Sequence, residues 1–307
     1  MNRTKFLTFR KCLLLALAGI FLWLLCAVFH PFEPRYQGKR LTAWAKEAFP
    51  TYMAMSPELR AKSDRAAAVI QQIGTNALPV ALNLCGTKDS CFKRKLEKCT
   101  EYNSDGVVKC LITTEWEKHE EGAAIIWALG PVAEPVIPSL IQLLQSQDRD
   151  IGLHIVDVLW GVGTNTIPPL IELLDNTNKV VRIRAVAALG HFGREAHAAN
   201  VAPMVVSAIV HCIQTETNGM YFWALGNFGT NAELSVPVLT NLLGSFKQPF
   251  YPPIPAVLGA LNRIDPEAAK PFIEEWRAAI ELNNIPDPSV KRLTNSSPGI
   301  QTNSVPP

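Results

Sequence analysis

Two apolar residues three positions apart, followed directly by glycine, recur along the chain and predict the ends of a series of short helices. In the clearest copy, residues 181–193, the apolar side chains fall at helical spacing, and Gly193 follows as a residue that tolerates positive φ. A helix this short is not stable alone, so its apolar face needs a neighbouring helix. The copies are Ile70…Ile73-Gly74, Ile126…Leu129-Gly130, Leu159…Val162-Gly163, Leu189…Phe192-Gly193, Leu225…Phe228-Gly229 and the degenerate Leu261…Ile264-Asp265.

A second motif, in most copies an apolar residue followed by proline, recurs in step with the first and predicts where the next helix begins. Proline is tolerated in the first helical turn, where its missing N–H would have no partner. Two motifs in step, with a period of about 34 residues, predict helical hairpins that cover one another's apolar faces. The alternative is an ordinary helical bundle with coincidental spacing. The pairs are Leu78-Pro79, Ile137-Pro138, Ile167-Pro168, Ala202-Pro203, Val236-Pro237 and Lys270-Pro271.

The stretch Asp175–Arg182, followed by Ala185–Gly190, resembles the HEAT repeat, in the short bacterial form shared with phycobilin-lyase-type proteins. The resemblance covers roughly residues 64–276. It implies an all-α fold, a right-handed α-solenoid of about five to six HEAT-like hairpins with an extended inner face. We therefore assign residues 64–282 to the solenoid, with a cysteine-containing insertion at 85–110. Repeats of this kind serve many tasks, so the resemblance specifies the fold more than the function.

The first thirty residues predict a membrane anchor. Residues 1–11 form a basic tail, and residues 12–29 form an uncharged apolar run close to the shortest helix that spans a bilayer. A cleaved signal peptide usually ends in a small-x-small triplet, but the triplet Ala16-Leu17-Ala18 lies inside the apolar run. Cleavage near Ala27 and a buried helix are the alternatives. We expect a single uncleaved transmembrane helix.

The charges around this run predict its orientation. The basic tail stays in the cytoplasm, so the repeats lie on the far side of the membrane, in the bacterial envelope. Cations between residues 35 and 40 reduce the asymmetry. Residues 30–63 are interpreted as a stalk and an N-terminal capping helix, and residues 283–307, rich in Pro, Ser, Asn and Thr, as a disordered tail. The capping helix would bury Leu41, Trp44, Ala45 and Phe49 on one side.

Four cysteines, Cys85, Cys91, Cys99 and Cys110, lie in the insertion. Their gaps are wider than those of zinc-binding pairs. In an oxidising compartment two disulfides are the simpler account, each contributing roughly 2–4 kcal/mol. Of the three possible connectivities we favour the nested one, Cys85–Cys110 with Cys91–Cys99; in the cytosol all four would stay reduced. The lysines and arginine of residues 88–98 form a solvated surface or a patch for anionic lipid or an acidic partner.

The sequence contains no pattern typical of a catalytic, cofactor or metal site. His119-Glu120-Glu121 lacks the second histidine of a zinc helix, and Gly161-Val162-Gly163 lacks the third glycine of a dinucleotide loop. His191 and His197 flank a repeat turn, where solvated polar residues are expected. We therefore expect a protein that is not an enzyme and has no cofactor or metal.

Charge argues against a nucleic-acid partner. Lys plus Arg number 29 against 27 Asp plus Glu, so nothing in the balance calls for a polyanion. The expected inner face is acidic to neutral and would repel phosphates. Its residues, on the second helices of the hairpins, are Gln142, Gln145, Glu172, Asp175, Asn241, Glu274 and Glu275.

Trp127 and Trp223 each lie in the sequence Trp-Ala-Leu-Gly and are interpreted as equivalent positions of two repeats. Large core residues between hairpins are favoured there over an aromatic ligand-binding stripe. The sequence thus predicts a non-catalytic, membrane-tethered scaffold that binds another protein along the inner face of the solenoid. Two alternatives stay open: an accessory or chaperone-like subunit of an enzyme system, as the resemblance to bilin lyases implies, and a structural spacer in the envelope.

Overall fold

A computed structural model describes residues 33–48, 56–88, 115–195, 198–246 and 253–282. They fall into two compact units, residues up to Val136 and residues from Ile137 onward, which are treated separately. Apart from one short two-stranded ribbon, the elements in these ranges are helices. The all-α interpretation is therefore confirmed for the described part of the chain. The predicted anchor at 12–29, most of the insertion and the tail at 283–307 lie outside it.

Unit 1 begins with a ribbon that the sequence interpretation missed. Strands β1 (Arg35–Tyr36) and β2 (Lys39–Arg40) pair antiparallel, joined at Gln37 (φ 51°) and Gly38 (φ 78°). Two residues with positive φ match the twist of a tight hairpin, so this part of the expected stalk folds back on itself. Helix α2 (Leu41–Ala48) consequently starts directly after the ribbon.

Helix α2 packs on two other helices of unit 1. Leu41, Trp44 and Ala45 are buried, and α2 packs on α3 (Pro57–Ile73) and α6 (Glu115–Leu129). Nε1 of Trp44 donates a hydrogen bond to the Tyr36 carbonyl oxygen (3.1 Å), which ties the ribbon to the helix. Phe49, the fourth expected member of this face, lies outside the described residues.

The rest of unit 1 is a first hairpin and the helix that covers it. Helix α3 starts earlier than expected, because Ser56 caps it by accepting a hydrogen bond from the Leu59 amide (3.3 Å). The 3₁₀ turn η1 (Gly74–Ala77) leads into α4 (Leu78–Cys85), and α4 packs on α6. The unit ends with the 3₁₀ segment η2 (Gly130–Val136).

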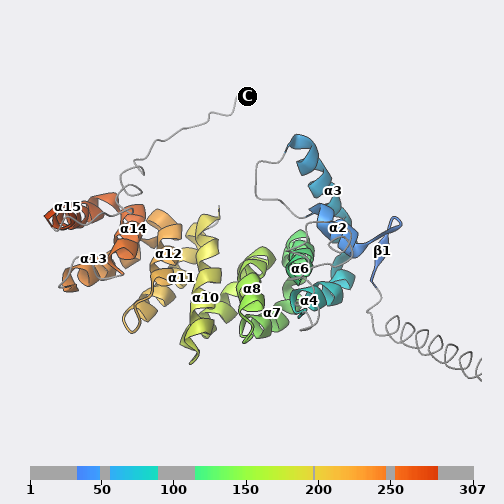
Figure 1. Ribbon diagram of the computed structural model, residues 1–307, viewed down its shortest axis with the longest axis horizontal. Helices are drawn as coiled ribbons and strands as arrows, with labels where there is room; N and C mark the ends of the chain where they lie inside the picture. Colours follow the sequence, from blue (N-terminus) through green and yellow to red (C-terminus); the bar gives the residue numbers. More distant parts are fainter. Residues whose placement is uncertain (1–32, 49–55, 89–114, 196–197, 247–252, 283–307) are drawn as a thin grey trace, which may run out of the picture. The chain divides into compact units, whose positions relative to one another are not determined.

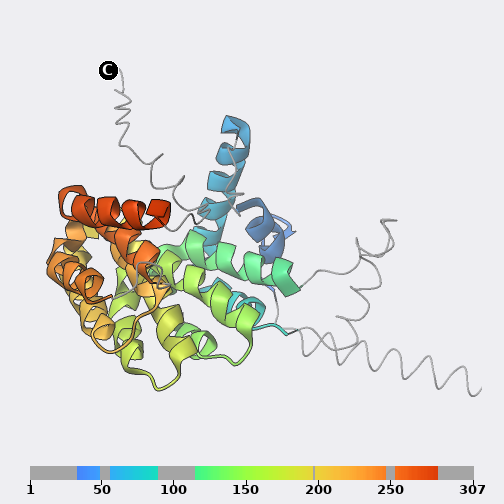
Figure 2. The same ribbon diagram turned by 60° about the vertical axis from the view of Figure 1, so that its left-hand side comes forward.

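Unit 2 is a stack of helical hairpins, an α-solenoid segment. Each first helix packs on the next in sequence order, α8 on α10, α10 on α12 and α12 on α14. Figure 1 shows this order, and Figure 2 shows it from a second direction. Each first helix buries one leucine of the apolar-x-x-apolar motif: Leu159, Leu189, Leu225 and Leu261. After α7 (Ile137–Leu144), the first helices are α8 (Arg149–Val162), α10 (Lys179–His191), α12 (Gly219–Phe228) and α14 (Ile254–Ile264), and the second helices are α9 (Ile167–Glu172), α11 (Ala198–Ile213), α13 (Val236–Ser245) and α15 (Pro266–Leu282).

The apolar-proline pairs mark most helix starts, but not all of them. Four second helices begin at the predicted residue, Leu78, Ile137, Ile167 or Val236, each after a 3₁₀ turn. The predicted starts at Ala202-Pro203 and Lys270-Pro271 are wrong, because both prolines lie inside longer helices, α11 and α15. In these two hairpins the residues before the proline continue as α-helix.

Gly193 is needed for a reason other than the predicted one. Positive φ ends the helices at Gly74, Gly130, Gly163 and Gly229, but Gly193 has no positive φ. A Cβ on Gly193 would lie 2.7 Å from the backbone nitrogen of Phe228, so the missing side chain allows α12 to come close. The turn after α10 is the 3₁₀ segment η5 (Phe192–Arg194).

The continuous run Glu115–Leu144 is long and apolar enough to cross a membrane by length and composition alone, with a mean hydropathy of 1.6. It is not one straight helix, because Gly130 (φ 54°) ends α6 and Pro135 lies in η2 before α7 begins. Within unit 1, α6 buries Ile125, Ile126 and Leu129 against the hairpin that it covers. These features are those of consecutive core helices.

Candidate protein-binding surface

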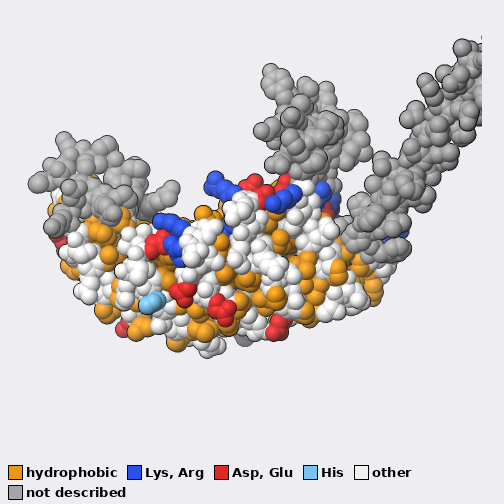
Figure 3. Space-filling view, turned by 90° about the horizontal axis from the view of Figure 1, so that it is seen from below, with side chains coloured by type: hydrophobic (Ala, Val, Ile, Leu, Met, Phe, Trp, Pro, Cys, Tyr) orange, Lys and Arg blue, Asp and Glu red, His pale blue; other side chains and the backbone are white. Residues whose placement is uncertain are grey.

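The second helices of unit 2 and the turns after them expose the polar side chains that the sequence placed on the inner face. Amide and acidic groups predominate among them. On the molecular face drawn in Figure 3, acidic and basic side chains are interspersed among apolar and uncharged ones. The exposed residues are Gln142, Gln145, Glu172, Asp175, Asn241, Glu274 and Glu275.

The first helices carry a different surface, which we call the aromatic ridge: Trp160 of α8, His191 of α10 and Trp223 of α12. The ring centroids of Trp160 and His191 are 6.0 Å apart, and those of His191 and Trp223 are 5.4 Å apart in an edge-to-face arrangement. All three side chains are half-buried. One ring from each of three successive repeats thus forms a continuous, partly exposed row.

Contacts between neighbouring hairpins hold the aromatic ridge in place. Gly190 leaves room for Trp223, since a Cβ there would lie 2.6 Å from Cζ3 of the indole. Nδ2 of Asn227 donates a hydrogen bond to the Gly190 carbonyl oxygen (3.1 Å). Nε2 of His191 lies 3.2 Å from Oδ1 of Asp157 on α8, which orients the imidazole between the two indoles. The ridge is therefore fixed before any ligand arrives.

The interpretation of Trp127 and Trp223 as equivalent positions is wrong. Gly130 and Gly229, with φ of 54° and 52°, end α6 and α12 and define the true register. Trp127 lies three residues before its glycine and Trp223 lies six before. The residue that shares the position of Trp127 is Trp160. Alignment on the helix-ending glycines would have shown this, but no local signal indicates that Trp160 and Trp223 meet at His191.

His191 also differs from the expectation of a solvated turn residue, because it ends α10 and stacks between two indoles. His197 lies outside the described residues. His119 is buried in unit 1, with Nε2 2.9 Å from the Thr87 carbonyl oxygen. In the part of the chain that the structure describes, no three His, Cys, Asp or Glu side chains are grouped so that they could hold a metal ion.

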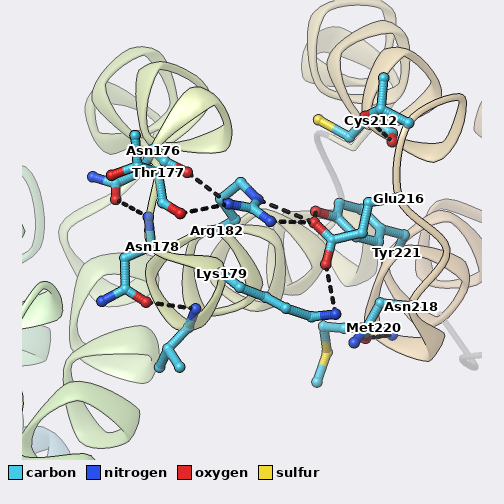
Figure 4. A network of polar contacts seen from close by, with 12 residues as sticks. Asn176, Thr177, Asn178, Lys179, Arg182, Cys212, Glu216, Asn218, Met220 and Tyr221 are labelled. Atoms are coloured by element: carbon cyan, nitrogen blue, oxygen red, sulfur yellow. Dashed lines mark hydrogen bonds and ion pairs between the residues drawn. The ribbon is translucent and has the colours of Figure 1, made fainter.

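A cluster of charged side chains joins two loops between successive hairpins of unit 2 (Figure 4). Arg182 donates to Oε2 of Glu216 through Nη2 (2.6 Å) and Nε (3.1 Å), and Lys179 lies 3.0 Å from Oε1. Nη1 of Arg182 also donates to the carbonyl oxygens of Asn176 (2.8 Å) and Thr177 (3.1 Å). Burial raises the pKa of Glu216, but the hydrogen bonds from Arg182 and Lys179 outweigh it and the pKa is lowered.

Arg184, two residues further along α10, makes the corresponding contacts with the preceding loop. Its guanidinium is buried and donates through Nη1 to the carbonyl oxygens of Leu144 (2.8 Å) and Ser146 (2.7 Å), and through Nη2 to that of Asp148 (3.2 Å). These include carbonyls at the end of α7 that have no helical partner. The two arginines of α10 therefore fix three successive inter-hairpin loops and keep the first helices in register.

Unit 1 contains a small open pocket of about 230 Å³, lined by Ala45, Lys46, Glu117, Glu120 and Glu121. Glu121 is buried and lies 3.2 Å from Nζ of Lys46. Burial raises its pKa above the usual range despite this ion pair. The side chains that line the pocket are three carboxylates, one lysine and one alanine.

Of the four disulfide candidates, only Cys85 lies in the described ranges. It is a free, fully buried thiol at the end of α4, and burial raises its pKa to about 12. Its Sγ lies against α6, 2.7 Å from where a Cβ on Gly122 would be. Cys91, Cys99 and Cys110 lie outside the described residues, so both pairings stay predictions.

Residues 117–190 and 137–218 match the family model of HEAT repeats. The central third of the chain is thus similar to HEAT repeats. No curated protein matches the sequence.

The solved structures that are similar to this chain include a designed protein and an engineered protein. One is a designed armadillo repeat protein in complex with the peptide (KR)4, with 15% sequence identity, a TM-score of 0.38, and coverage of 74% of this chain and 100% of that chain. The other is an engineered protein with 16% identity, a TM-score of 0.28, and coverage of 78% and 95%.

Proposed function

We propose that this protein is a membrane-tethered scaffold without chemistry of its own, which binds another protein on the exposed surface of its HEAT-like repeats. The observation that carries the proposal is the aromatic ridge, a row of half-exposed rings contributed by three successive hairpins. Tryptophan and arginine side chains supply much of the binding energy in protein interfaces, and Arg194 lies beside Trp223. The polar second-helix face predicted from the sequence offers fewer anchoring side chains.

The two faces can be separated by site-specific photo-crosslinking in intact cells. A photoreactive phenylalanine derivative would replace Ala187, one turn before His191 on the ridge side of α10, or Asn241 on the second helix α13. We expect one partner protein to be captured from position 187 and identified by mass spectrometry. Capture from position 241 alone would place the interface on the second helices, and no reproducible capture from either would refute the scaffold function.

Membrane tethering rests on the apolar run at 12–29 and the cations before it. The chain should stay with membranes after an alkaline wash, and deletion of residues 1–29 should release it. Topology is tested with Ser207→Cys, which places a thiol on the exposed side of α11. A membrane-impermeant maleimide should label this variant in intact cells whose outer barrier is opened; labelling only after lysis of the inner membrane would reverse the orientation.

A further inference from the structure

We propose that the partner segment received by the aromatic ridge is acidic, with carboxylate side chains that bind Arg194 and Arg263. This inference rests on the scaffold function proposed above and adds the chemistry of the bound segment. Its basis is a pair of exposed arginines, one over the half-exposed ring of Trp223 and the other along α12 three residues after it.

Arg194 follows α10 and reaches over the next hairpin. Its Cζ lies 5.3 Å from the centroid of the Trp223 ring, a cation–π contact that holds the guanidinium at the ridge. Glu195 is adjacent in the sequence but lies outside ion-pair distance of it. Among the described residues, no carboxylate lies within 4.0 Å of the Arg194 guanidinium.

Arg263 comes from α14, which packs on α12. Its Cδ is 3.4 Å from where a Cβ on Gly226 would be, so the stem of the arginine lies along α12 three residues after Trp223. The side chain is exposed, and within the described ranges no acidic partner lies within ion-pair distance of it. Within the described ranges, both guanidiniums therefore lie at the surface without a carboxylate at ion-pair distance.

The carboxylate of Asp157, which lies at the ridge beside His191, is already engaged. Its Oδ1 lies 3.2 Å from Nε2 of the imidazole. Arginine binds carboxylates through two parallel hydrogen bonds, and complementary charge determines which partner is accepted. Two exposed arginines near one indole fit an extended segment in which acidic residues flank an aromatic or large aliphatic side chain.

An acidic protein segment suits this surface better than a nucleic acid. Nucleic-acid binding draws on many phosphate contacts, whereas the ridge offers two arginines and also carries the carboxylate of Asp157 beside His191. Stacking on Trp223 and pairing with two guanidiniums require only a few residues of chain. The expected recognition element is therefore short and needs no folded domain of its own.

The test uses the full chain in a neutral detergent and measures fluorescence anisotropy of labelled peptides at low salt. The probes are a twelve-residue peptide of alternating Glu and Phe, the same peptide with Lys in place of Glu, and a single-stranded DNA oligonucleotide. We expect saturable binding of the acidic peptide only. Arg194→Gln and Arg263→Gln should each weaken it about tenfold, which corresponds to about 1.4 kcal/mol.

Arg149→Gln is the matched control, because Arg149 is an equally exposed arginine at the opposite end of α8 from Trp160. It should change the affinity less than about twofold. Unchanged thermal unfolding of the three variants would show that the fold is retained. The inference would be overturned if the basic peptide bound as tightly as the acidic one, or if the DNA bound more tightly than the acidic peptide. It would also be overturned if the double variant Arg194→Gln/Arg263→Gln bound the acidic peptide as tightly as the natural chain does. If photo-crosslinking from position 187 succeeds while the acidic peptide fails, the scaffold function stands and the proposed chemistry falls.

Discussion

Gly152 and Arg184 should be energetically coupled, because one makes room for the other. A Cβ on Gly152 would overlap the guanidinium of Arg184, so alanine at 152 must displace it from the three carbonyls that it binds. Hydrogen bonds to charged groups are worth roughly 1.5–3 kcal/mol each and do not add fully. We expect Arg184→Ala to lower the free energy of unfolding by about 3 kcal/mol.

The sign of the Gly152→Ala effect should depend on the residue at 184. In the natural chain, the displaced guanidinium should make Gly152→Ala destabilising by about 2 kcal/mol, since about 1 kcal/mol of gained helix propensity offsets part of the loss. With Arg184→Ala in place there is nothing to displace, and the same substitution should stabilise by up to about 1 kcal/mol. The double-mutant cycle should therefore show a coupling of about 3 kcal/mol.

Urea unfolding of the four proteins, followed by circular dichroism, measures this coupling. Hydrogen exchange at the backbone amides of residues 145–152 adds a local readout, because the guanidinium fixes the loop before α8. Gly259→Ala is the control: this glycine lies within α14, and a Cβ there would meet nothing within 4 Å. It should be neutral or stabilising. If Gly152→Ala costs the same with and without Arg184, the packing argument is refuted.

Three further predictions concern single groups. Glu216→Gln should destabilise the fold by about 1 kcal/mol at neutral pH, because it weakens the contacts of Arg182 and Lys179. The folded-state pKa of Glu216 is lowered, so this contribution to stability is present above the ordinary pKa of a glutamate. In urea unfolding, the free energies of the variant and the natural chain should therefore converge as the pH falls through the folded-state pKa. Glu121→Gln should have the opposite effect, because burial raises the pKa of Glu121 and its ionisation opposes folding. The variant should be more stable than the natural chain at pH 7 and should lose that advantage in acid, and a variant that is less stable at pH 7 would contradict the burial argument. The Cys85 thiol, with its pKa raised to about 12, should resist alkylation at pH 8 until the chain unfolds, and peptide mass spectrometry can follow the labelling. Rapid labelling of the folded protein would contradict the burial of this thiol. Labelling of the unfolded chain only after reduction would support the predicted disulfide.

The helical pattern was predictable because it is encoded locally. The apolar pairs ending in glycine gave the first helices, and Leu78, Ile137, Ile167 and Val236 gave starts of second helices. At two places the predicted helix starts or connections differ from the structure. Pro203 lies inside α11, and Gln37-Gly38 forms a tight turn inside the expected stalk. The exposed polar face of the second helices was likewise readable from spacing alone.

The contacts between hairpins were not predictable, because they join residues that are distant in sequence. Gly193 was assigned to positive φ, whereas its role is the close approach of α12. Arg184 binds carbonyl oxygens some forty positions earlier, and nothing near it in the sequence indicates that. The aromatic ridge needed the register of three helices before Trp160, His191 and Trp223 could be seen as one surface.

The sequence by itself therefore determined that this chain forms short amphipathic helices in repeated pairs, because helix propensity, proline starts and glycine ends act within a few residues. Only the tertiary structure decided which side chains meet across the pairs. That outcome depends on the rotation and spacing of each helix against the next, which small residues such as Gly152 and Gly190 set by allowing close approach. The surface offered to a partner is a product of that stacking.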